Sequence, residues 1–140
     1  MQTKYAAFKE SVAHVHRQLT EVRQLMEAWN ALPSNATKLR DQTRSAIMDQ
    51  LPTLQSSAYH MIETANAATS DSFYSYADTS SIYTTLNAID AIYKATGSQY
   101  SSSSLYAAAS RSSLNTYTSP TASYSYGWYG SSYADYDWGY

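Results

Sequence analysis

Apolar residues in the first thirty positions recur at alternating intervals of three and four. This spacing places them on one face of an α-helix and matches the a and d positions of a heptad repeat. It predicts one long helix over residues 3–31, about 43 Å in length at 1.5 Å per residue. Thr3 is placed to cap its start, and Pro33 follows its end. The residues of this packing seam are Tyr5, Phe8, Val12, Val15, Leu19, Val22, Met26 and Trp29.

The positions beside this seam argue against a simple two-stranded coiled coil. With Tyr5 at position a, several e and g positions can be positively charged and none is acidic, so a parallel homodimer would place like charges opposite each other. Leu25 also widens the apolar stripe. We therefore predict packing against other helices, within the chain or in neighbouring subunits. The e and g positions are Lys4, Lys9, Ser11, His16, Gln18, Arg23 and Leu25.

A second apolar face follows the first helix, but Pro52 interrupts it. Proline removes a backbone donor and clashes with the preceding turn. The sequence therefore predicts two helices, 36–50 and 53–69, with a break or kink near Leu51. The short link at 32–35 predicts that the chain folds back on the first helix as a helical hairpin or small bundle.

A further helix is predicted over residues 80–96, with Ser80 as its cap and Gly97 after its end. The Ser-rich segment 98–115 contains a weaker helical pattern, because serine is a poor helix former. Residues 1–97 therefore form the predicted helical domain, and one short helix is expected between it and the C-terminal region.

From residue 116 onward, aromatic side chains stand among Ser, Gly, Thr and Ala, in a chain with 15 tyrosines in total. The composition resembles low-complexity segments that associate through aromatic contacts. We expect an irregular, extended arm over 116–140 that packs on its own domain or on neighbouring subunits, attached to an all-α domain. The aromatic residues of this assembly arm are Tyr117, Tyr124, Tyr126, Trp128, Tyr129, Tyr133, Tyr136, Trp138 and Tyr140.

Charge and composition narrow the classes of partner. The formal net charge is -2 and charged residues make up 14% of the chain, against about 25% in an ordinary domain. Nucleic-acid binding is not expected, because only Arg111 adds a positive charge near the arm and a basic groove is missing. The sequence contains no run of the roughly twenty apolar residues that a membrane span needs, and no apolar signal region at its start. We expect a soluble protein, or one exported by a route that the sequence does not reveal.

Few residues suggest catalysis or metal binding. Glu10 and His14 share a helix face, as do His60 and Glu63, but each pair supplies too few ligands for a metal site. The chain has no cysteine, no Gly-x-Ser-x-Gly motif and no phosphate-binding loop. We therefore expect no catalytic residue, metal, cofactor or small-molecule substrate.

The favoured hypothesis is a non-enzymatic structural subunit of a virion, phage tail, capsid, filament or shell. The helical body would fix geometry, and the arm would join it to further copies or to other structural subunits. Asp135 and Asp137 could bind a cation weakly or pair with the basic flank of a neighbouring helix. The alternative is a coiled-coil binding module or adaptor with an adhesive tail. A small bundle enzyme or metal carrier, using His14 and His60, is the least favoured hypothesis.

Overall fold

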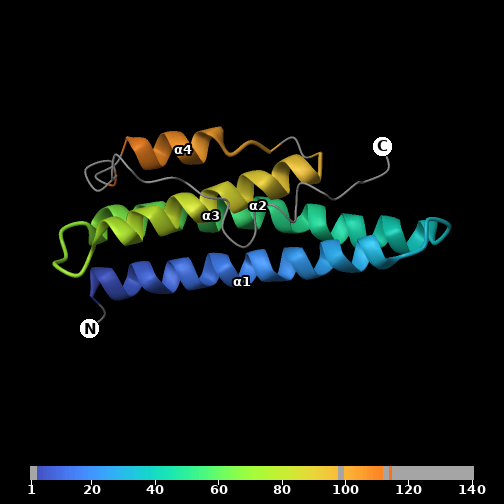
Figure 1. The fold of residues 1–140 in the computed structure, drawn as a ribbon, viewed down its shortest axis with the longest axis horizontal. Helices are drawn as coiled ribbons and strands as arrows, with labels where there is room; N and C mark the ends of the chain where they lie inside the picture. The colour runs from blue at the N-terminus through green and yellow to red at the C-terminus, as the bar shows by residue number, and fades with distance from the viewer. Residues whose placement is uncertain (1–2, 98–99, 112–113, 115–140) are drawn as a thin grey trace.

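The computed structural model of the protein describes residues 3–97, 100–111 and 114. These residues form an up-down-up-down arrangement of four α-helices, without a strand (Figure 1). The all-α fold class is thus confirmed for the described part of the chain, whereas the predicted arm lies outside it. The helices are α1 (Lys4–Ala31), α2 (Thr37–Ala68), α3 (Tyr76–Ala95) and α4 (Ser103–Ser110).

Helix α1 begins and packs as its periodicity predicts. The Thr3 side chain accepts a hydrogen bond from the Ala6 backbone N–H at 3.0 Å, which caps the first turn. Tyr5 and Val12 are partly buried, and the other six seam residues are buried. The flanking Ser11 and Gln18 are buried as well. The buried stripe is therefore wider than a two-stranded seam, because α1 contacts both α2 and α3.

Helix α2 corrects the prediction of two helices over 36–50 and 53–69. It is one continuous helix, with Pro52 inside it and exposed to solvent. Leu51 and Leu54, on either side of the proline, are fully buried. Proline in a helix interior costs about 3 kcal/mol, and burial of apolar side chains along the α1–α2 interface outweighs that cost.

The α1–α2 hairpin is closed at its turn by Arg40. Its guanidinium lies 3.9 Å from the centre of the Trp29 ring and donates a hydrogen bond to the Leu32 carbonyl at 3.0 Å. A cation over an indole face is the most favourable form of cation–π contact. The pairing therefore ties the first turn of α2 to the last turn of α1.

Helix α3 starts at Tyr76, one turn earlier than the predicted helix over 80–96, so Ser80 is not its cap. Ser75 caps it instead, in a capping box with Asp78. Residues on most sides of α3 are buried, because α1, α2 and α4 all contact it. Beyond its end, Gly97 has a φ of 62°, a left-handed conformation that glycine adopts without strain.

Helix α4 is the short helix expected in the Ser-rich segment. Its Leu105 and Ala109 are buried, and it runs antiparallel to α3 (Figure 1). Side-chain contacts fix this direction: Ser102 donates to Asp90, and Tyr106 donates to Asn87, which lies nearer the start of α3.

Candidate functional site

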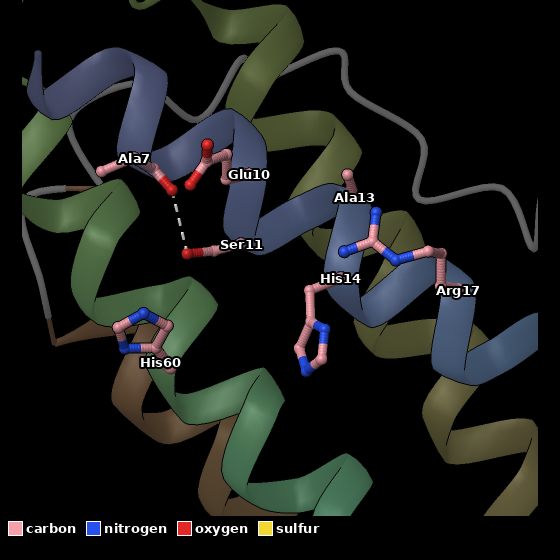
Figure 2. Close-up of a pocket in the computed structure, with 7 residues that line it drawn as sticks. All are labelled: Ala7, Glu10, Ser11, Ala13, His14, Arg17 and His60. Atoms are coloured by element: carbon pink, nitrogen blue, oxygen red, sulfur yellow. Dashed lines mark hydrogen bonds between the residues drawn. The ribbon is translucent and has the colours of Figure 1, made fainter. Parts of the chain in front are cut away.

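An open groove of about 530 Å³ runs between α1 and α2 in the half of the bundle that contains the start of α1. Figure 2 shows its residues, of which all but one belong to α1. The lining combines small, basic, acidic and imidazole side chains: Ala7, Glu10, Ser11, Ala13, His14, Arg17 and His60.

The groove brings together two histidines that the sequence placed in separate pairs. His14 comes from α1 and His60 from α2, and both border the same space (Figure 2). Among the described residues, no group of three or more His, Asp or Glu side chains is arranged to hold a metal ion. The hydroxyl of Ser11 donates to the Ala7 carbonyl at 3.0 Å, which engages its proton within α1. Its described lining residues therefore offer individual polar groups and no nucleophile–base pair.

His16 makes a polar contact between α1 and α3. Its Nε2 lies 3.1 Å from the hydroxyl of Thr85, and that hydroxyl donates to the Ser81 carbonyl at 2.9 Å. Because the threonine proton is already used, Thr85 accepts from His16, and this network assigns the proton to Nε2. Burial lowers the pKa of His16 below its usual value of 6.5. The neutral imidazole is thus the form that fits between the two helices.

Tyr5 and Asp78 connect the first turn of α1 to the first turn of α3. The Tyr5 hydroxyl donates to Asp78 Oδ1 at 3.2 Å, while Asp78 Oδ2 accepts from the Ser75 backbone N–H at 3.0 Å. Burial, followed by the negative charge of Asp78, raises the pKa of Tyr5. The Asp78 carboxylate therefore caps α3 and also joins α3 to α1.

One end of the bundle exposes aromatic side chains. Phe73, in the α2–α3 connection, is 75% exposed, and Tyr76, the first residue of α3, is 54% exposed. The Phe73 ring lies 6.1 Å from the ring of Tyr5, and Lys9 Nζ lies 5.9 Å from that tyrosine ring. We call Tyr5, Phe73 and Tyr76 the aromatic end. The Ser75–Asp78 spacing could have indicated the cap, but no periodic signal indicated which aromatic residues would be exposed.

The two predicted sets of site residues have different outcomes. Six of the eight seam residues of α1 are buried in the core, whereas Tyr5 and Val12 are partly buried and pack against it. The nine aromatic residues of the assembly arm lie outside the described residues, as do Asp135 and Asp137.

No protein-family model matches this chain, and neither a curated protein nor a solved structure is found to be similar to it. Within the described ranges, no helix has the length and apolar character needed to cross a membrane.

Proposed function

We propose that this chain is a structural self-assembly subunit, in which a helical body fixes geometry and an aromatic C-terminal arm contacts other subunits. The observation that carries this proposal is the exposed Phe73 at the aromatic end. Aromatic residues are enriched at protein interfaces, where a few of them contribute much of the binding energy.

The body has the properties of a rigid scaffold. Its α1 seam is buried along the length of the helix, and Tyr5–Asp78 and His16–Thr85 hold α3 in register with α1. Close-packed interiors deform little. A rigid body of this kind keeps the aromatic end in a constant position relative to the helices, which repeated assembly requires.

The surface and the arm also support assembly. The low charge content limits repulsion between copies. The arm contributes tyrosine and tryptophan, whose rigid rings give large contact areas at low entropic cost. The proposed partners are further copies or other structural subunits, in an assembly such as a virion, phage tail, capsid, filament or shell.

The adaptor alternative receives less support. It requires the heptad seam of α1 to pair with a helix of another protein. That seam is buried against α2 and α3 within the chain, and its central residues Leu19 and Val22 are fully buried. Pairing with an external helix would first require the bundle to open.

The test is light scattering at several concentrations, comparing the full chain with a chain that ends at Asn115. We expect the full chain to form a discrete oligomer or filament, and the shortened chain to stay helical by circular dichroism but dissociated. A full-length variant with the nine arm aromatics changed to serine is the matched control for length and should also dissociate. A full chain that is monomeric at every concentration, or a shortened chain that assembles equally well, would contradict the proposal.

A further inference from the structure

We infer that the aromatic end receives the arm of a second copy, so that two bodies exchange arms reciprocally. This inference rests on the proposed function and adds to it a specific receiving surface. Three observations support it: how the structure holds Phe73, which groups surround it, and where the chain leaves α4.

Phe73 is held outward by a defined turn. Its backbone N–H donates to Asp71 Oδ1 at 3.0 Å, and the next N–H, that of Tyr74, donates to the Asp71 carbonyl at 3.1 Å. Tyr74 itself is buried, with its hydroxyl 2.8 Å from that of Thr79. The turn thus buries one aromatic ring and presents its neighbour to solvent. A backbone fixed in this way loses little conformational freedom when a partner binds.

The surroundings of Phe73 match the composition of the arm. Tyr5 offers an aromatic ring beside it, and the exposed Lys4 and Lys9 lie on the first turns of α1. The arm combines aromatic rings with Asp135 and Asp137. Aromatic rings pack favourably edge to face or offset, and the carboxylates are complementary to the two ammonium groups.

The acidic groups of this surface are already engaged. Asp71 accepts the Phe73 N–H, and Asp78 accepts from Tyr5 and Ser75. Their hydrogen bonds direct both carboxylates toward the protein's own donors. Both carboxylates keep their negative charge, and the exposed Lys4 and Lys9 are the cationic groups on the adjoining turns of α1.

Helix α4 finishes at the end of the bundle that holds this surface. Because α4 runs antiparallel to α3, the chain leaves it at the end of the bundle that holds the start of α3 and the α2–α3 connection (Figure 1). Fully extended, residues 115–140 would span about 85 Å at roughly 3.3 Å per residue. Helix α2, the longest of the described helices, is about 48 Å long. The arm can therefore reach farther than the length of any of these helices. With donor arm and receiving surface at one end, two copies related by a two-fold axis can exchange arms in a closed contact.

Photo-cross-linking of the full chain tests the occupant directly. A benzophenone amino acid replaces Phe73, and ¹⁴N-labelled and ¹⁵N-labelled proteins are mixed, dissociated, reassembled and irradiated. We expect cross-links from position 73 to peptides within 117–140, including pairs that carry one isotope from each copy. Cross-links only between peptides of the same isotope would mean that the chain's own arm occupies the surface, and would overturn the inference. Cross-links that never reach 117–140 would overturn it as well.

Substitutions in the full chain give a second, independent test. We expect Phe73→Ser to weaken association by about tenfold or more, as for a central interface residue. The control is Leu39→Ser at the α1–α2 turn, since Leu39 is a large apolar residue with 55% exposure. Equal effects of the two substitutions would indicate general stickiness and overturn the inference.

Charge reversal then tests the electrostatic contact. Asp135→Lys with Asp137→Lys should weaken association, and Lys4→Glu with Lys9→Glu added to it should restore the affinity. Failure of this restoration would overturn the assigned pairing.

If the wild-type chain and Phe73→Ser assemble alike, the docking surface is wrong and the assembly proposal stands. If the wild-type chain is monomeric at every concentration, both fail.

Discussion

Different kinds of contact hold the α1–α2 hairpin together and position the α3–α4 pair. Along the hairpin, long apolar faces meet, and fully buried residues such as Leu19 and Leu51 recur at heptad intervals. Helix α3 has an apolar core face too, but side-chain hydrogen bonds also fix its position. His16 contacts Thr85 and so joins α1 to α3. Ser102, which precedes α4, donates to Asp90 of α3. Apolar burial therefore supplies most of the stability, while polar contacts select one arrangement of the helices.

The largest expected effect tests the apolar side of this comparison. Leu51→Ala should lower the free energy of unfolding by about 2–5 kcal/mol, because it removes a fully buried side chain and leaves a cavity. Urea unfolding followed by circular dichroism at fixed protein concentration measures the change. Leu39→Ala is the control, and should stay within about 0.5 kcal/mol at an exposed site. Equal losses at both positions would show that the hairpin seam is not the main source of stability.

The neighbouring residue should give an effect of opposite sign. Pro52→Ala is expected to raise the free energy of unfolding by about 1–3 kcal/mol, because it restores a backbone donor inside α2 and removes a helix-breaking ring. The same unfolding measurement applies, with Thr53→Ala as the control for helix propensity at an exposed site. A loss of stability in Pro52→Ala would mean that the local geometry imposed by proline is needed for packing.

A smaller effect tests the polar side of the comparison. Tyr5→Phe should lower the free energy of unfolding by about 1 kcal/mol, since it removes a partly buried hydrogen bond to Asp78. The measurement is a double-mutant cycle with Asp78→Ala. Additive effects of the two substitutions would show that the Tyr5–Asp78 contact does not couple α1 to α3.

The smallest expected effect depends on pH. Burial lowers the pKa of His16 in the folded protein, so the unfolded chain takes up this proton first as the pH falls. The contribution of His16 to stability is therefore complete above pH 6.5 and decreases as the pH drops from there through its folded-state pKa. His16→Gln should flatten this part of the stability profile relative to the wild-type chain. An unchanged slope in His16→Gln would contradict the assignment of the neutral imidazole.

Local patterns in the sequence predicted the apolar side of the fold well. The seam from Tyr5 to Trp29 follows from helical periodicity, which depends only on nearby residues. The break predicted at Pro52 was wrong, because a local preference was outweighed by burial against a distant segment. The predicted start of α3 at residue 80 is one turn late, because Ser80 is a possible cap but the capping-box spacing belongs to Ser75 and Asp78.

The site was less accessible to prediction because it depends on how helices pair. His14 and His60 border one groove only through the register of α1 against α2. The contact between His16 and Thr85 joins residues far apart in the chain, and no local rule specifies it. The exposure of Phe73 likewise follows from a turn in which Asp71 accepts the Phe73 N–H.

The closure of the hairpin by Arg40 has a consequence for how the chain folds. Trp29, Leu32 and Arg40 are close in sequence, so their contact requires only a small loop to close. Contacts of this kind form early, and the two long helices can then zip together away from the turn. The Tyr5–Asp78 contact spans most of the described chain and should form late. We therefore expect native-state hydrogen exchange to separate a resistant α1–α2 unit from a region around α4 that opens at lower free energy.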